Sequence, residues 1–243
     1  MKLRVLFNLV FICLVSNLFS QVMDTDRSIL DTNERPGFIK EKKPEVENPL
    51  SKNYYLSSVW QVGSINFVNS KSLNNVLLKY DIVKHIVEIK DGDEVYMVSA
   101  KSVDNFTWFN TEQSHFERFE SIENFYDIPE ALFGFFEVLN SSKNGIDEYK
   151  LLSHHDVYVY VANTSVSLSG SHRSNDLFWS DQFYLYKNGN IVAIPGKRKE
   201  AYSMFKDHED EMKKFIRKNG LYFKNHEDLN KIFSEYFRLI INS

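Results

Sequence analysis

The sequence predicts an α+β fold, mainly an antiparallel β-sheet in the form of a sandwich or a partial barrel, closed by two to three C-terminal helices. From about Tyr54, short apolar runs with a period of two residues follow one another, as in half-buried strands. Turns that contain glycine separate several of these runs, and connections this short favour antiparallel pairing. Beyond Pro195 the apolar period becomes helical.

The first twenty residues have the layout of a secretory signal peptide. Lys2 and Arg4 precede an apolar run over residues 5–15. This run is shorter than the roughly 20 residues that a membrane-spanning helix requires. We therefore expect cleavage after Ser20, so that the exported chain begins at Gln21 and resides in the periplasm, on the cell surface or outside the cell.

A retained anchor helix over residues 3–19 is the alternative. Cys13, the single cysteine, lies inside the apolar run and is not preceded by the small residue that a lipoprotein cleavage site requires. Removal of residues 1–20 therefore leaves a chain without disulfides, thiolate metal ligands or a cysteine nucleophile. It also removes Lys2 and Arg4, which changes the formal net charge from −4 to −6.

Length and charge limit the classes of protein that the exported chain can belong to. Residues 53–243 are enough for a single β-rich domain with a helical end over residues 196–243. A mildly acidic chain without a long basic cluster lacks the electrostatic footprint of a nucleic-acid-binding protein. We expect no nucleic-acid partner and no membrane span after removal of the signal peptide.

Residues 21–52 form a polar leader that carries three of the five prolines and shows no apolar period. Such a composition predicts a flexible segment, because few apolar side chains are present to offset the entropy lost on ordering. The alternative is an arm that packs on the domain, for which Phe38-Ile39 is the available apolar pair.

Eleven short segments have the pattern of strands. Asp91-Gly92 and Asn188-Gly189 each join two of them in the manner of a tight hairpin, and residues 141–145 form a longer connection. Within 157–161, valines and tyrosines alternate, which predicts a valine face and a tyrosine face. The expected strands span residues 62–68, 74–80, 85–90, 94–99, 106–109, 115–120, 132–139, 148–152, 157–161, 182–187 and 191–194.

Three helices are expected after Pro195. The first covers residues 198–206, and the second begins with Asp207 as its cap and ends at Gly220. The third begins after Asn225 and has the most regular apolar stripe in the chain. That stripe must cover an apolar surface, and it consists of Leu229, Ile232, Phe233, Tyr236, Phe237 and Ile240.

The sequence assigns no catalytic residue, metal ligand or cofactor. His154-His155-Asp156 is the densest group of metal-type ligands, but neighbours in a strand point in opposite directions. His115 and His172 are isolated, and the serines of 167–171 lack the first glycine of a nucleophile turn. The chain also lacks a phosphate-binding glycine loop, a dinucleotide fingerprint and a zinc-binding helix motif. A pair of carboxylates for glycoside hydrolysis stays open, because that test is spatial.

Aromatic residues are the candidates for ligand binding. Such residues on exposed strands can stack on sugars or grip peptides. The alternative is that they lie under the C-terminal helices or half-cover an exposed face of the sheet. The candidates are Tyr158, Tyr160, Trp179, Tyr184 and Tyr186.

Three segments resemble a group of uncharacterised exported proteins of the Bacteroidetes. They are Trp60–Ile65 with the hairpin that follows, Phe135–Leu139, and residues 183–189 with the helices that follow as far as Phe237. The resemblance covers most of the exported chain and implies a bacterial cell envelope, but no activity. The sequence as a whole favours a non-enzymatic binding or structural module whose partner is an envelope protein or a glycan. A hydrolase of envelope polymers is the alternative.

Overall fold

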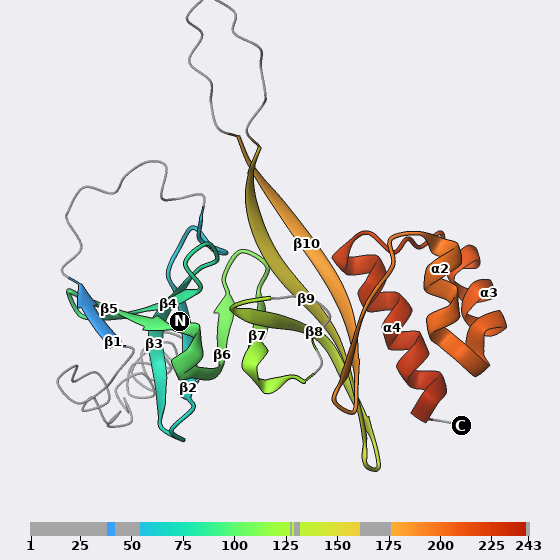
Figure 1. The fold of residues 1–243 in the computed structure, drawn as a ribbon, viewed down its shortest axis with the longest axis horizontal. Coiled ribbons are helices and arrows are strands. Elements are labelled where there is room, and N and C mark those ends of the chain that lie inside the picture. Colours follow the sequence, from blue (N-terminus) through green and yellow to red (C-terminus); the bar gives the residue numbers. More distant parts are fainter. Residues whose placement is uncertain (1–37, 42–53, 127, 129–131, 161–175, 242–243) are drawn as a thin grey trace, which may run out of the picture.

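The computed structural model describes residues 38–41, 54–126, 128, 132–160 and 176–241. Within them, one antiparallel sheet of 11 strands runs in the order β1-β5-β4-β3-β2-β6-β7-β8-β9-β10-β11 (Figure 1). The strands are β1 (Phe38–Glu41), β2 (Gln61–Phe67), β3 (Ser72–Asp81), β4 (Ile86–Asp91), β5 (Glu94–Ser99), β6 (Val103–Asn110), β7 (His115–Ser121), β8 (Phe135–Asn144), β9 (Asp147–Tyr160), β10 (Asp176–Lys187) and β11 (Asn190–Ala193).

The mainly antiparallel sheet and the helical C-terminus are confirmed, but the sheet is open. Strands β1 and β11 form its two ends, and the helices cover one face of β8–β10 instead of closing the sheet. Within the described residues the regular helices are α2 (Arg198–Tyr202), α3 (Glu209–Asn219) and α4 (His226–Ile241), of which α3 and α4 are the long ones. Single-turn 3-10 segments are η4 (Ala100–Ser102) and η5 (Ile122–Asn124), and η6 (Ser203–His208) joins α2 to α3.

One of the three predicted turns has the expected residues, and the other two are displaced along the chain. Asn188 and Gly189 form a two-residue hairpin loop in which both residues have positive φ, as predicted. The other predicted hairpin is shifted by one residue, because Asp91 pairs with Glu94 and the loop is 92–93. Residues 141–144 belong to β8 and not to a loop, so the turn is 145–146.

The helix ends show one correction. Gly220 ends α3 in the left-handed conformation, with φ 65°, as the sequence predicts. The expected first helix is α-helical only as far as Tyr202 and continues as η6, which is interrupted at Lys206, whose φ is 43°. Asp207 is therefore not the cap of α3, which begins after His208 without a side-chain capping bond. Asn225 does cap α4, since its Oδ1 accepts a hydrogen bond from the Asp228 amide at 2.8 Å.

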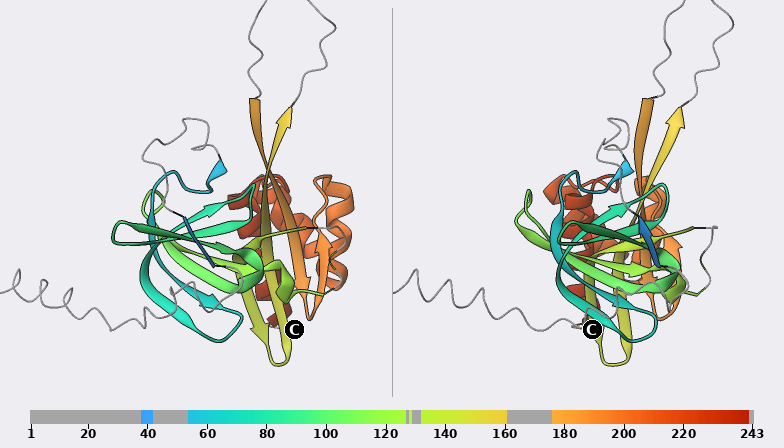
Figure 2. Two further views of the ribbon diagram at one scale, coloured as in Figure 1. Left: turned by 60° about the vertical axis from the view of Figure 1, so that its left-hand side comes forward. Right: turned by 90° about the vertical axis from the view of Figure 1, so that its left-hand side faces the viewer.

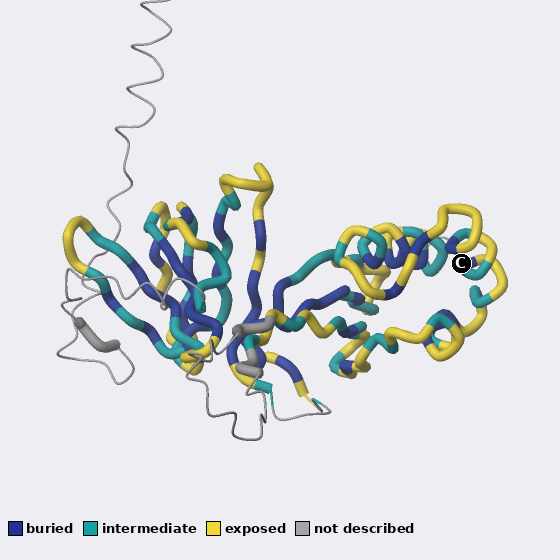
Figure 3. The backbone as a smooth tube through the Cα atoms, turned by 90° about the horizontal axis from the view of Figure 1, so that it is seen from above, coloured by how far each residue is buried: buried dark blue, intermediate teal, exposed yellow. Residues whose placement is uncertain are grey.

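Two separate cores lie on the same face of the sheet. The curved strands β2–β7 enclose the first, in which the rings of Phe106 and Phe119 stack at 4.5 Å. The second fills the space between β8–β10 and the helices (Figure 2), where Tyr149 meets Phe237. Figure 3 shows the corresponding buried segments along the sheet and on the inner sides of the helices. The cores are joined by a strip of sheet that carries polar side chains.

Strands β9 and β10 extend beyond their neighbours as a two-stranded ribbon (Figure 1). Pairing of β8 with β9 stops at His154, and β11 pairs only with 184–187 of β10. Residues 155–160 and 176–181 consequently pair only with one another among the described strands. The sequence pattern predicts two strands here, 148–152 and 157–161, because the polar run from Ser153 to Asp156 interrupts the apolar pattern. The structure shows one continuous strand, β9.

Part of the polar leader belongs to the sheet. Residues Phe38–Glu41 form β1 and pair with Val95–Val98 of β5. This strand contains Phe38-Ile39, the pair through which the sequence allowed an arm to pack on the domain. The remaining leader residues, 21–37 and 42–52, lie outside the described residues.

Candidate functional site

A strip of polar residues crosses the sheet between the two cores. The strand register places Phe119, Glu137, Ser153 and Phe183 side by side on one face. Phe119 belongs to the first core, and Phe183 packs against the second. Glu137 and Ser153 are both buried in this strip, where the low dielectric strengthens charged interactions.

His155 lies two residues beyond Ser153 and therefore on the same face. Its Nε2 atom is 2.8 Å from Oε2 of Glu137, and its Nδ1 atom is 2.8 Å from Oδ1 of Asp181. The imidazole thus connects β8, β9 and β10. Burial by itself would lower the pKa of His155, but the hydrogen bonds to Asp181 and Glu137 and their negative charges outweigh it and raise the pKa to about 9.

The same bridge acts on Asp181, whose side chain is 48% exposed. The hydrogen bond from His155 lowers the pKa of this carboxyl, against the opposing effect of burial. At neutral pH the bridge is therefore an imidazolium between two carboxylates, and each ring nitrogen donates one hydrogen bond.

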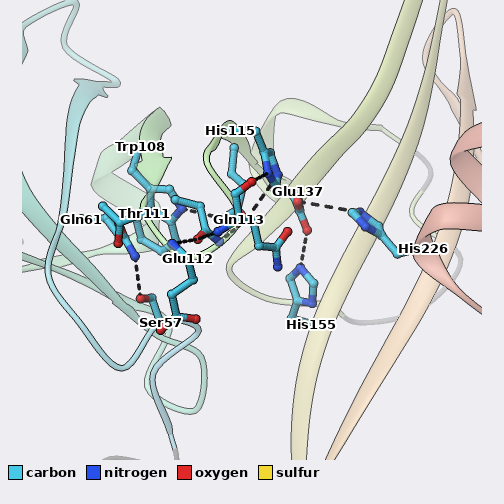
Figure 4. A network of polar contacts seen from close by, with 12 residues as sticks. Ser57, Gln61, Trp108, Thr111, Glu112, Gln113, His115, Glu137, His155 and His226 are labelled. Atoms are coloured by element: carbon cyan, nitrogen blue, oxygen red, sulfur yellow. Dashed lines mark hydrogen bonds and ion pairs between the residues drawn. The ribbon is translucent and has the colours of Figure 1, made fainter.

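The first turn of α4 brings a second histidine to this group (Figure 4). His226 Nε2 lies 3.9 Å from Oε1 of Glu137, and no hydrogen-bond partner for this nitrogen is found among the described residues. The Oγ atom of Ser153 is also buried without a partner in the described part of the chain. Glu137 consequently links the helical end of the molecule to the ribbon through two histidines.

Another buried carboxylate, Glu117, lies on β7 beside this strip. It accepts hydrogen bonds of 2.6 Å from Trp108 Nε1 and from Asn110 Nδ2. His115 Nε2 is 3.6 Å from the same carboxylate. These contacts satisfy Glu117 within the protein and explain the position of His115, which the sequence had left isolated.

The geometry of the strip is that of a structural bridge. A general base needs an unprotonated nitrogen within reach of the proton that it removes, whereas His155 donates from both nitrogens. His155 therefore cannot act as the base that activates Ser153, although both side chains lie on the same face. Among the described residues, no group of three or more His, Cys, Asp or Glu side chains is arranged to hold a metal ion.

The aromatic candidates separate into different environments. Tyr184 is buried, and its hydroxyl donates to Gln182 Oε1 at 2.7 Å. Tyr186 packs beside Phe125 in a third apolar cluster. Tyr184 and Tyr186 are thus packed against other side chains, as in the alternative to ligand binding. They do not lie under the C-terminal helices.

Trp179, by contrast, is 46% exposed on the ribbon. Its register partner is Val157, and alternation places it on the face that carries His155 and Asp181. Tyr158 and Tyr160 belong to β9, but their side chains lie outside the described part of the structure. Among the three candidates whose side chains are described, Trp179 is the most exposed.

The other described residues that the sequence offered as metal ligands or catalytic groups do not lie together with His155. His154 and Asp156 lie on the face of β9 opposite to His155, and His154 Nε2 is 3.0 Å from the carbonyl oxygen of Phe133. Residues 167–171 and His172 lie outside the described residues.

Sequence reasoning missed the partners of His155. Glu137 had a signal, because it is a single charge in the apolar run Phe135–Leu139. Asp181 and His226 have no such signal in the sequence. Their place in this group depends on which strand and which helix end lie next to His155 and Glu137.

Comparisons with protein families, with curated proteins and with solved structures found no match to this chain. Among the described helices, none combines the length and the apolar character needed to span a bilayer.

Proposed function

We propose that the protein is an exported, non-enzymatic binding module that uses the β9–β10 ribbon to contact a component of the cell envelope. Export is supported by the basic, then apolar, layout of residues 1–20. Curved strands β2–β7 act in this proposal as a partial barrel, a scaffold that carries the ribbon. The partner is an envelope glycan or an envelope protein.

The observation that carries the proposal is the ribbon with Trp179 on it. Trp179 and Asp181 are two residues apart on one strand face, about 7 Å from each other along the strand. An exposed indole can stack on the apolar face of a sugar ring, while a carboxylate accepts hydrogen bonds from its hydroxyl groups. This combination favours a glycan over a protein partner.

The base of the ribbon is held in place by the His155 bridge. The bridge contacts β8 and β10 at the position where the ribbon leaves the sheet. A recognition element that is held before binding loses less conformational entropy when the ligand arrives. The bridge therefore supports binding without taking part in any reaction.

The alternative is a hydrolase of envelope polymers. It would need a carboxylic acid and a second carboxylate free to act on a glycosidic bond. Glu137 and Asp181 are the carboxylates closest to that description, but each is hydrogen-bonded to His155. This engagement favours the binding module.

Binding to purified envelope glycans tests the proposal. The chain from Gln21 onward is incubated with peptidoglycan and with soluble envelope polysaccharide, and bound protein is measured by co-sedimentation and by tryptophan fluorescence. We expect Trp179→Ala to weaken binding at least about tenfold, as for an aromatic residue at the centre of an interface. The melting temperature should be unchanged, because Trp179 is exposed.

Tyr222→Ala is the matched control. Tyr222 is 58% exposed at the helical end of the molecule, and its loss should leave glycan binding unaltered. Equal binding by wild type and Trp179→Ala would refute the proposed recognition surface. Time-dependent release of reducing sugar by the wild type would instead support the hydrolase.

A further inference from the structure

A second site lies where connections between strands β3 to β8 meet, and none of its described lining residues belongs to the ribbon. Four connections meet there: the turn 82–85 between β3 and β4, the segment η4, the segment η5, and residues 132–134 before β8. They surround a cavity of about 170 Å³. Loops grouped at one end of a rigid sheet are a common location for ligand sites.

The walls of this cavity are held by backbone contacts. The amide of Ala100 donates to the carbonyl oxygen of His85 at 3.0 Å, and the amide of Ile122 donates to that of Gly134 at 3.1 Å. Gly134 has a φ of 90° and packs against Tyr80 so closely that a Cβ atom would collide with the tyrosine hydroxyl. The cavity is consequently formed before any ligand enters.

The lining combines an apolar floor with hydrogen-bond donors. Ala100 and Ile122 are buried, and the half-exposed Phe133 lies at the rim with its ring 5.9 Å from that of His85. Ser99 contributes a hydroxyl group to the lining. A ligand that fills this space must therefore have both an apolar part and a polar end.

The charges at the rim favour an anionic end. Lys84 and Lys101 both line the cavity, and Glu123 supplies the one carboxylate among its described lining residues. Lys84 is paired with Asp81 at 3.5 Å, whereas Lys101 has no ion-pair partner among the described residues. The ammonium of Lys101 is thus the cation available for a ligand carboxylate.

We propose that this cavity binds a small organic carboxylate, with its charged end at Lys101 and Ser99 and its apolar part against Ile122 and Phe133. A volume of about 170 Å³ corresponds to about six water molecules, at roughly 30 Å³ each. This size suits an acid with a short alkyl chain or a single ring, and is too small for a disaccharide. The site is separate from the proposed glycan surface on the ribbon.

Titration of the wild-type protein with matched probes tests the ligand class. Butyrate, butylamine and 1-butanol have similar apolar parts and differ in charge. Amide chemical shifts of Ala100, Ile122 and Gly134 report on the cavity without any substitution. We expect saturable shifts with butyrate in the millimolar range, and binding at least about tenfold weaker for the amine and the alcohol. Absence of saturable shifts with butyrate, or equal affinity for the alcohol, would overturn the proposal.

Substitution of the lysine tests the position of the charged end. Lys101→Gln should weaken butyrate binding at least about tenfold, and Lys101→Arg should retain most of it. Lys143→Gln removes an exposed lysine at the far end of β8 and should have no effect. Trp179→Ala should also leave butyrate binding intact, which keeps this test independent of the glycan test. Unchanged affinity in Lys101→Gln would show that the carboxylate does not bind there.

Discussion

His155 joins three strands at the position where the ribbon leaves the sheet. Its two ring nitrogens contact Glu137 on β8 and Asp181 on β10, each at 2.8 Å. The pKa of His155 is raised to about 9, above the ordinary value of 6.5, so folding favours the protonated ring. The stability that this preference contributes is complete below pH 6.5 and is lost as the pH rises through about 9.

The variant His155→Gln should therefore be destabilised in a pH-dependent manner. A neutral side chain leaves the buried Glu137 without its counter-charge, which typically costs about 3–5 kcal/mol in the free energy of unfolding. The free energy of unfolding, measured with urea, should be lower in the variant by about this amount at pH 6–7. The difference from wild type should be much smaller at pH 10.

A comparison variant and a clear counter-result complete this test. His115→Gln alters a half-exposed histidine near Glu117 and should change stability by less than about 0.5 kcal/mol. A difference between wild type and His155→Gln that stays constant from pH 6 to pH 10 would show that His155 is neutral in the folded protein.

Helix α4 is the element that attaches the helical end to the sheet. The stripe expected from three-four spacing is confirmed at Leu229, Ile232, Phe233, Tyr236 and Phe237, which are buried, whereas Ile240 is only partly buried against the same core. The opposite face carries the ion pair between Arg238 and Glu235. The helix is thus part of the core.

Phe237→Ala should lower the melting temperature strongly. The ring is 3% exposed and contacts Tyr149 of β9, and truncation of a buried phenylalanine typically costs about 3–5 kcal/mol. This is a large part of the roughly 5–15 kcal/mol that stabilises a domain. Thermal unfolding followed by circular dichroism measures the change.

Glu235→Ala is the control on the same helix. It removes one ion pair between neighbouring turns, which contributes only about 0.3–0.5 kcal/mol. If both variants had equally small effects, α4 would be exposed in solution or would pair with another chain.

At the scale of the whole molecule, the proposed export would determine which partners the protein can meet. We predict that the exported chain begins at or near Gln21, because a basic start and a short apolar run precede it. Intact mass of the protein recovered from the periplasm or the medium measures this directly. A chain that still carries Met1 to Phe19, or that stays in the inner membrane, would contradict the prediction.

The sequence by itself determined the local features of this protein. The hairpin at Asn188-Gly189, the end of α3 at Gly220 and the apolar stripe of α4 follow from interactions between residues a few positions apart. Such interactions leave a pattern in the sequence, because glycine permits positive φ and a helix repeats every 3.6 residues.

Only the tertiary structure decided which polar residues meet. Glu137, His155 and Asp181 come from three strands, and the cavity beside Lys101 is formed by four separate connections. Their proximity depends on strand register, since a shift of one residue would turn each side chain to the other face. The open sheet has the same cause: its edges are set by pairings between distant strands, which the sequence pattern of a single strand does not specify.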